Sequence, residues 1–529
     1  WSGKNISNND FKYAEGRTDK NKAFGGLAFV DGAKLTVVDS VFDNNTFDYV
    51  GGVFATGVGG GVLDVSGSTF SNNHSTFDGG AIGGYGVLKV TNSTFVGNTT
   101  DLTKDAEGNY TVAVEDNLPV GGGAISFGAV SSSDIASIND TKFINNVSGI
   151  NGGAIGTRLG KNANNSAAKL NVSATFDGNR AYQNGGAIYN TFYANNGMGL
   201  GDGVTVAGNF TKNSAGKNGG AIFNDGALDK IGNAGGVMTI RDSLFSENTA
   251  ATWGGAIFNS GTLTLGDGVS FTGNSAKFGG AVWNDGKMEI AAGTKFVGNN
   301  SKSAAGALYN SSTGTLDNLI GVVFENNTAA MGGAINNAKT SADAKGGTID
   351  LISKSHFIGN SGGKSQGGAI RNQGTISTIT DSVFDSNIAG NGGAINNGTW
   401  GSLVKGIYKT TFINNTAVAT GGNHQGGAIT NAGHIGIIDE TVFESNRAGK
   451  IGGAIANVTP QNSGGGLAEV NIANSTFTGN VAGESGGAIY NATGGAVSLA
   501  GENTFTGNMA GGVGNDIYNL GKLAVTGGT

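Results

Sequence analysis

The feature that most constrains the fold of this chain is a repeated motif, Phe-x-x-Asn. Sixteen copies of it recur along the 529 residues, at a mean spacing of about 31 residues. Repeats of this length are typical of solenoids, in which each repeat packs against its neighbours along the chain. The sixteen Phe residues are Phe42, Phe70, Phe95, Phe143, Phe176, Phe210, Phe245, Phe271, Phe296, Phe324, Phe357, Phe384, Phe412, Phe443, Phe477 and Phe505. The chain is therefore expected to fold as a stack of similar coils.

A second motif, Gly-Gly-Ala followed by Ile or Val, comes after the first motif in most copies. It begins at Gly79, Gly122, Gly152, Gly185, Gly219, Gly254, Gly279, Gly332, Gly367, Gly392, Gly426, Gly452 and Gly486, and Ala305 begins a degenerate copy. Ahead of each Phe lies a third segment with alternating apolar residues, such as Leu263-Thr264-Leu265. Each repeat thus holds three short strand-like runs separated by Gly, Asn, Asp and Ser turns.

Three strands and three turns in about 31 residues describe one coil of a parallel β-helix. The preference for right-handed crossovers between parallel strands favours a right-handed coil. We predict an all-β fold, a right-handed, single-stranded parallel β-helix of the pectate-lyase type with about 16–18 coils. We expect one continuous domain over residues 1–529, interrupted by an inserted loop at residues 99–120.

Equivalent residues of consecutive coils should lie above one another and form columns. Phe and Ile would fill the interior, Asn suits a sharp corner and can bond to the next Asn, and the Gly pair permits a positive φ. The residues taken as representative of these columns are Phe245, Asn248, Phe271, Asn274, Phe296, Asn299, Gly254, Gly255 and Ile257.

Composition narrows the possible classes of protein. The 99 Gly follow no Gly-X-Y period and Pro occurs twice, which excludes collagen, and 38% hydrophobic residues at regular positions argue against disorder. A net charge of −7 without basic clusters predicts no nucleic-acid partner. No apolar stretch approaches a membrane span, and the absence of an initiator Met suggests a fragment of a longer chain.

The paired motifs resemble the polymorphic outer-membrane proteins of chlamydiae and related autotransporter passengers of Gram-negative bacteria. The resemblance extends from about Phe42 to Asn519. It implies an extracellular, outer-membrane-tethered passenger that takes part in adhesion. It also implies an adhesive role for single motif copies, represented here by Gly254-Gly255-Ala256-Ile257 and Phe271-Thr272-Gly273-Asn274. Unlike many chlamydial members, this chain has no Cys, so disulfide links to neighbours are not expected.

The residues most suited to contact a partner are aromatic and lie beside the second motif or in the inserted loop. Alternation with the inward Ile predicts that they face outward and form an exposed stripe, which could bind sugars or a protein, or pack beneath a loop or a neighbouring molecule. The candidates are Tyr110, Tyr189, Phe192, Tyr193, Phe223, Phe258, Trp283 and Tyr309. Further loop candidates are residues 160–168, 191–202, 339–347, 418–425 and 458–465.

No catalytic, cofactor or metal site is predicted. Acidic residues are scattered, the four His lack ligand spacing, and no calcium-binding nonapeptide array occurs. Three functions stay open. The first is adhesion to a host or neighbouring-cell protein or glycan. The second is a structural stalk, sheath or filament, with self-association along its axis, and the third is an enzyme acting on polysaccharides.

Overall fold

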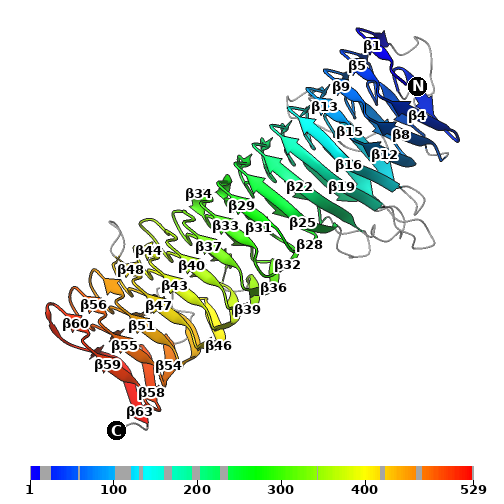
Figure 1. Ribbon diagram of the computed structural model, residues 1–529. Coiled ribbons are helices and arrows are strands. Elements are labelled where there is room, and N and C mark those ends of the chain that lie inside the picture. Colours follow the sequence, from blue (N-terminus) through cyan, green and yellow to red (C-terminus); the bar gives the residue numbers. More distant parts are fainter. Residues whose placement is uncertain are drawn as a thin grey trace. The chain divides into compact units, whose positions relative to one another are not determined.

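A computed structural model of the chain describes residues 2–11, 25–57, 60–101, 121–129, 135–159, 169–192, 203–226, 236–341, 344–417, 423–459 and 468–526. The chain forms two compact units, Trp1–Val269 and Ser270–Thr529, each of which is a stack of parallel strands (Figure 1). Among the described residues, all elements of regular secondary structure are strands.

One coil of the second unit illustrates the repeat. Its strands are β42 (Thr375–Thr380), β43 (Val383–Asp385), β44 (Ile388–Ala389) and β45 (Ile395–Asn397). The corners between them are made by residues with positive φ: Asp381 at 49°, Ser386 at 56° and Gly392 at 61°. Left-handed backbone is costly for most residues except Gly, Asn and Asp, which explains why short polar residues and Gly separate the strands.

The strands that carry the repeated Phe pair in parallel from coil to coil, with Phe opposite Phe. In the first unit they are β5 (Val41–Asp43), β9 (Thr69–Ser71), β13 (Thr94–Val96), β16 (Ile135–Ile144), β19 (Lys169–Asp177), β22 (Val204–Thr211) and β25 (Val237–Ser246). In the second they are β29 (Ser270–Thr272), β33 (Lys295–Val297), β37 (Val323–Glu325), β40 (His356–Ile358), β43, β47 (Thr411–Ile413), β51 (Val442–Glu444), β55 (Thr476–Thr478) and β59 (Thr504–Thr506).

The strands that follow the Gly-Gly-Ala motif form a second parallel sheet in each unit. The first unit has β3 (Ala28–Val30), β7 (Phe54–Thr56), β11 (Ile82–Gly84), β15 (Ile125–Ala129), β18 (Ile155–Leu159), β21 (Ile188–Phe192), β24 (Ile222–Asn224) and β27 (Ile257–Asn259). The second has β31 (Val282–Asn284), β35 (Leu308–Asn310), β38 (Ile335–Asn337), β41 (Ile370–Asn372), β45, β49 (Ile429–Asn431), β53 (Ile455–Asn457), β57 (Ile489–Asn491) and β62 (Ile517–Asn519). The described residues thus hold eight such strands in the first unit and nine in the second, which confirms the predicted parallel β-helix and agrees with the predicted 16–18 coils.

Most of the remaining strands lie before the Phe strands or just after their Asn corners. Those before the Phe strands are β4 (Lys34–Val38), β8 (Val62–Ser66), β12 (Val87–Thr91), β28 (Thr262–Leu265), β32 (Lys287–Ile290), β36 (Thr315–Ile320), β39 (Thr348–Ser353), β42, β46 (Ser402–Tyr408), β50 (His434–Asp439), β54 (Glu469–Ala473), β58 (Ala496–Ala500) and β63 (Lys522–Thr526). In β16, β19, β22 and β25 this segment and the Phe segment form one strand. The short strands after the corners include β20 (Arg180–Ala181), β30 (Ser275–Phe278), β34 (Asn300–Ala304), β48 (Thr416–Ala417), β52 (Arg447–Ala448) and β56 (Val481–Ala482).

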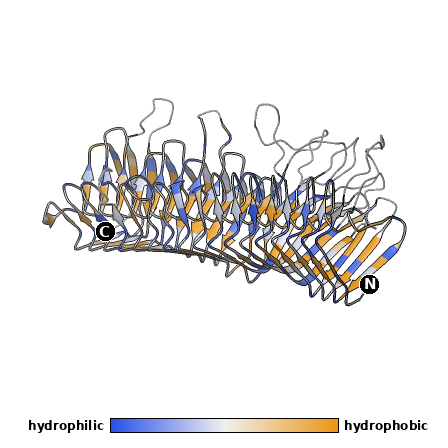
Figure 2. Cartoon of the chain, turned by 90° about the horizontal axis from the view of Figure 1, so that it is seen from above, coloured by the Kyte–Doolittle hydropathy of each residue, from blue (hydrophilic) through white to orange (hydrophobic). Residues whose placement is uncertain are grey.

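Stacked Phe rings run through the interior of each unit. Phe210 and Phe245 stack with ring centroids 4.7 Å apart in the first unit, and Phe271 and Phe296 stack at 4.8 Å in the second. All four side chains are fully buried. Figure 2 shows apolar and polar residues alternating along the strands, as expected when one side of each strand lines the core. Ring stacking thus repeats at the spacing of the parallel strands.

A column of buried Asn residues follows the Phe column. In the first unit the Asn213 side-chain amide donates to Asn248 Oδ1 at 3.0 Å, and Asn248 donates to the carbonyl oxygen of Phe210 at 2.8 Å. In the second unit Asn274 donates to Asn299 Oδ1 at 2.9 Å. Because each amide both donates and accepts, the column satisfies its own buried polar groups.

The Gly-Gly pair forms the corner that leads into the next strand. Gly254 has a φ of 64°, and a Cβ atom there would collide with the carbonyl oxygen of Ile257. Gly254 and Gly255 are buried, and Ile257 is fully buried in the interior. Close backbone approach and positive φ together require Gly at the first position of the pair.

Candidate functional site

The middle residue of each Ile-x-Asn strand points away from the interior. Its two neighbours, Ile and Asn, are fully buried, whereas the middle residue is often half-buried. We call these middle positions the outward column. In the second unit it consists of Trp283, Tyr309, Asn336, Arg371, Asn396, Thr430, Ala456, Tyr490 and Tyr518, paired in register from coil to coil.

In the first unit, Tyr189, Phe223 and Phe258 occupy the outward column as predicted, but they do not form an exposed stripe. Phe223 and Phe258 are 9% and 6% exposed, which corrects the predicted exposure of these two residues. The physical reason is ring stacking: Tyr189 covers Phe223 at 5.3 Å, and Phe223 covers Phe258 at 4.6 Å. The Trp253 ring stacks on Phe258 at 5.9 Å.

Tyr189 is the polar end of this stack. Its hydroxyl donates to Asp225 Oδ2 at 3.5 Å, and the Thr191 hydroxyl donates to the same oxygen at 2.9 Å. Burial and the Asp225 charge raise the pKa of Tyr189 above its ordinary value, so the hydroxyl stays protonated and acts as a donor.

In the second unit, Trp283 and Tyr309 are half-buried and more accessible than the Phe pair of the first unit. Their rings stack at 4.1 Å, and Phe278 meets both edge-on, at 6.2 and 5.9 Å. The Lys277 ammonium lies 5.4 Å from the Phe278 ring. These side chains form a small aromatic surface cluster.

The other predicted partner-binding residues lie wholly or partly outside the described residues. Tyr110 and Tyr193 fall outside them, as does most of the predicted insert, residues 102–120. The first residues of the predicted insert are not part of a loop, because Thr99–Thr100 form strand β14, which pairs in parallel with β10 (His74–Ser75). Phe192 ends β21, and its side chain is also outside the described set.

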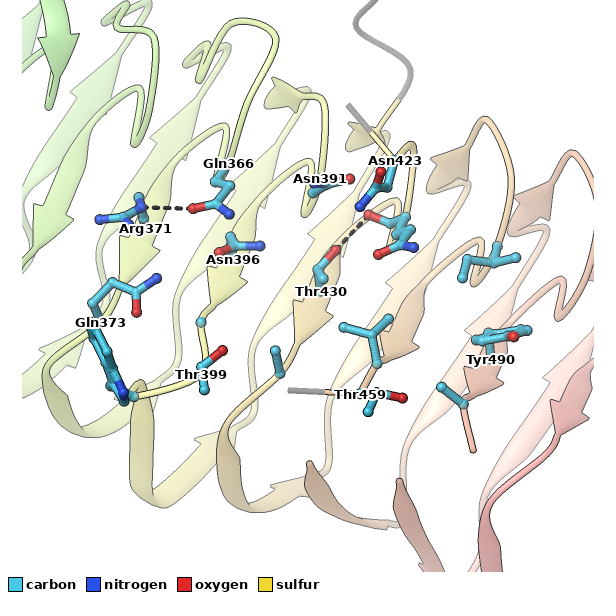
Figure 3. Close-up of a pocket in the computed structure, with 17 residues that line it drawn as sticks. Gln366, Arg371, Gln373, Asn391, Asn396, Thr399, Asn423, Thr430, Thr459 and Tyr490 are labelled. Carbon is cyan, nitrogen blue, oxygen red and sulfur yellow. Dashed lines mark hydrogen bonds between the residues drawn. The ribbon is translucent and has the colours of Figure 1, made fainter. Parts of the chain in front are cut away.

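Farther along the second unit, the outward column lines an open groove with a volume of about 480 Å³ (Figure 3). Its floor is formed by Arg371, Asn396 and Thr430, on three consecutive strands in register. One wall comes from the residues just before the Gly-Gly pairs, which are also in register: Gln366, Asn391 and Gln425. The groove therefore runs across consecutive coils rather than within one.

The opposite wall comes from residues just after the strands. Gln373 is 8% exposed and lines this side with Thr399 and Trp400, which are half-buried. Tyr490 lies at the far end, three coils beyond Asn396 in the outward column. The volume lies within the range of roughly 300–1,000 Å³ that is usual for small-molecule sites.

Among the described residues that line the groove, Arg371 is the one cation and none carries a carboxylate. Its Nε donates to Gln366 Oε1 at 2.9 Å, and its Nη1 donates to Asn336 Oδ1 at 3.0 Å. Burial lowers the pKa of the guanidinium, and the nearby Tyr309 opposes that shift. Neutral amides thus fix the orientation of the Arg371 side chain without neutralising its charge.

Two amides of the groove have buried oxygen atoms without a hydrogen-bond partner among the described residues. They are Oδ1 of Asn396, a residue only 4% exposed, and Oδ1 of Asn391. Thr430, in contrast, is held by a hydrogen bond from its hydroxyl to the carbonyl oxygen of Gln425 at 2.6 Å. Unpartnered buried acceptors are uncommon in folded proteins.

Sequence reasoning missed this groove. The signal that could have found it is the x position of Ile-x-Asn, which reads Arg371, Asn396 and Thr430 in consecutive copies. Alternation places these residues in the column that was predicted to carry aromatic side chains. The prediction considered only the aromatic residues of this column and therefore did not include these three polar residues.

Among the described carboxyl groups of the first unit, Asp78 has the largest shift in pKa. It is 4% exposed; its Oδ1 accepts the Gly121 backbone N–H at 2.7 Å, and its Oδ2 lacks a partner among the described residues. Burial raises the pKa of Asp78 from 3.8 to about 8, while the Gly121 hydrogen bond and the Arg158 charge oppose this shift. The carboxyl is therefore largely protonated at neutral pH.

Within the described ranges, no group of three or more His, Cys, Asp or Glu side chains could hold a metal ion. Within the same ranges, no helix has the length and apolar character needed to cross a bilayer.

Five segments of the chain match the family model described as the Chlamydia polymorphic membrane protein repeat. They cover residues 173–191, 208–225, 242–260, 268–285 and 474–492. No curated protein and no solved structure matches the chain. The match confirms, at these five segments, the resemblance drawn from the two motifs.

Proposed function

Since the chain carries the repeat of the polymorphic membrane proteins, we propose that it is a passenger-type stalk on the outer surface of a Gram-negative bacterium. In this proposal it mediates adhesion, by binding a protein or glycan of a host or neighbouring cell. It performs no catalysis.

One observation carries the proposal: the residues that repeat are buried, and the residues that vary face outward. Phe and Asn of the first motif and Gly and Ile of the second build the interior of both units. The outward column of the second unit changes from aromatic to amide to cationic side chains between strands that share the same backbone. A rigid repeated scaffold with a variable surface is the arrangement that solenoid proteins use for binding.

A cell-binding assay tests adhesion. Fluorescent chain is titrated onto panels of eukaryotic and bacterial cells, and saturable binding to at least one panel is expected. Replacement of both Trp283 and Tyr309 by Ala removes the accessible aromatic cluster, and deletion of residues 102–120 removes the part of the predicted insert that lies outside the described residues. At least one of these two changes is expected to weaken binding several-fold, whereas Lys522→Ala, at an exposed residue of β63, is not.

Absence of saturable binding to every cell type would reject adhesion. The structural alternative, a sheath or filament subunit, would then be favoured. It predicts ordered end-to-end polymers of the purified chain in electron micrographs.

A further inference from the structure

We propose that the groove over β41, β45 and β49 binds the uronic-acid sugars of an acidic polysaccharide, with a sugar carboxylate on Arg371. The inference rests on the proposed function, because it names the ligand class of a surface-binding protein. It uses residues that neither repeated motif contains.

The charge of the groove selects an anion. Arg371 is half-buried and meets two neutral amides, Gln366 and Asn336, and no ion pair with a described Asp or Glu offsets its charge. A guanidinium has five N–H donors, so these two bonds leave donors on Nη1 and Nη2 for a ligand. A carboxylate matches that planar pair with two parallel hydrogen bonds.

The next two coils supply groups that suit hydroxyls. Asn391 and Asn396 line the groove with amide side chains. Gln425 and Gln373 add further amides along the walls. Sugar hydroxyls both donate and accept, as amides do, so they are chemically matched to these side chains.

The length of the groove fits a chain of sugars rather than one ring. Consecutive coils are about 4.8 Å apart, and an extended polysaccharide advances by a similar distance per sugar. Arg371, Asn396 and Thr430 therefore present one polar group for each successive ring (Figure 3). Trp400 and Tyr490 provide aromatic side chains of the kind that pack against the C–H faces of sugars.

The geometry does not favour the other polyanions. An acidic peptide would add to a sheet edge or place side chains in apolar pockets, but β41 is paired on both sides and amides dominate the groove. Nucleic acid requires several cations along its phosphates, whereas the part of the groove that the structure describes has one.

Isothermal titration calorimetry with the full chain tests the proposal. The probes are a galacturonate tetramer, a hyaluronan tetrasaccharide, uncharged cellotetraose and a tetraglutamate peptide. One or both uronate probes are expected to bind at least tenfold more tightly than cellotetraose and tetraglutamate. The galacturonate tetramer represents plant or microbial polysaccharide and the hyaluronan fragment represents animal matrix, so the probe that binds more tightly indicates the source.

Variants are taken from residues that the outward column already accepts. Asn occupies the column on both coils next to Arg371, so Arg371→Asn should fold while it removes the cation. It is expected to weaken uronate binding at least tenfold and to abolish the preference over cellotetraose. Asn396→Thr, which copies Thr430, should weaken binding of uronate and neutral sugars alike. Arg447→Asn, at an exposed cation on β52 outside the groove, should change nothing.

Unchanged uronate binding by a folded Arg371→Asn variant would overturn the proposal, and so would equal affinity for tetraglutamate. Amide hydrogen exchange of the Phe strands establishes that each variant is folded. A chain that binds cells but none of the sugars would refute the groove proposal and leave adhesion standing. A chain that binds uronates but no cell would refute adhesion and leave the groove proposal standing.

Discussion

Replacing Asn415 by Ala should loosen the second unit locally and severely. The Asn415 side chain is fully buried and makes four hydrogen bonds. It donates to the Phe384 carbonyl oxygen at 2.8 Å and to Asn446 Oδ1 at 3.0 Å. It accepts from the backbone N of Asn387 at 3.1 Å and from its side-chain amide at 3.0 Å.

The expected cost follows from these bonds. At about 1 kcal/mol net for each, their loss removes about 4 kcal/mol. Part of the neighbouring network survives, because the backbone N of Asn415 still donates to Asn446 Oδ1 and the Asn387 amide still reaches Phe357. The backbone N of Asn387, however, loses its partner in a buried site. A total loss of about 4–5 kcal/mol is therefore expected.

Amide hydrogen exchange measured by mass spectrometry can locate this loss. Since about 1.4 kcal/mol corresponds to a factor of ten, exchange in peptides from residues 384–446 should speed up by about a thousandfold. Strands several coils away, such as β33, should keep most of their protection, because a solenoid is stabilised mainly by contacts between neighbouring coils.

The neighbouring residue provides a matched control. Asn414 is exposed and has a φ of 56°, and Gly479 holds the same position two coils later with a φ of 62°. Asn414→Gly should therefore change exchange by less than about tenfold, since Gly costs a few tenths of a kcal/mol to about 1 kcal/mol there. If Asn415→Ala and Asn414→Gly gave similar exchange, the side-chain bonds of the Asn column would not hold the coils together.

Three further predictions concern stability measured by urea denaturation and circular dichroism. Because burial raises the pKa of Asp78 to about 8, the folded chain keeps a proton that the unfolded chain loses above about pH 4. Stability should then fall by about 1.4 kcal/mol per pH unit between about pH 4 and pH 8, and Asp78→Asn should remove that fall. Equal pH profiles of the two proteins would contradict this prediction. Phe357→Ala removes a fully buried ring and should cost about 3–5 kcal/mol, so a loss below about 1 kcal/mol would argue against the Phe column as core. Gly367→Ala should destabilise more than Gly494→Ala. Both glycines have positive φ, at 68° and 80°, but an added Cβ collides with backbone at Gly367 and meets nothing within 4 Å at Gly494. Equal losses would show that φ, and not close approach, selects Gly.

The fold could be predicted because its repeated residues act through neighbouring coils. Phe271 and Phe296 are 25 residues apart and stack, and the motif spacing alone brings them into register. The outward direction of Tyr189 and Phe223 also followed from strand alternation. Their burial did not, because it depends on how each ring covers the next, which a pattern of inward and outward residues does not specify.

The groove was harder to predict because three columns build it. Gln366 precedes a Gly pair, Arg371 lies within a strand and Trp400 follows the strand of the next coil. Coil lengths differ, so the residues that meet across the groove share no fixed spacing. The polar residues were also individually unremarkable in a chain rich in Asn and Gly. The register of β41, β45 and β49 is what shows that the polar residues Arg371, Asn396 and Thr430 lie side by side.

The buried columns hold the fold together, whereas the groove is open to a ligand, and this difference decides which residues should be changed to test adhesion. The resemblance implies adhesive roles for motif copies such as Gly254-Gly255-Ala256-Ile257. These residues, however, are buried. Gly254 also has a positive φ, a backbone conformation that is unfavourable for residues with a side chain. A substitution there would lower stability and binding together, so lost adhesion would not identify a contact. A change at Arg371 or Trp283 leaves the Phe and Asn columns in place. A variant that binds more weakly but keeps the same hydrogen-exchange protection in the Phe and Asn columns has lost a contact with its partner. A variant that loses both binding and protection has lost part of its fold.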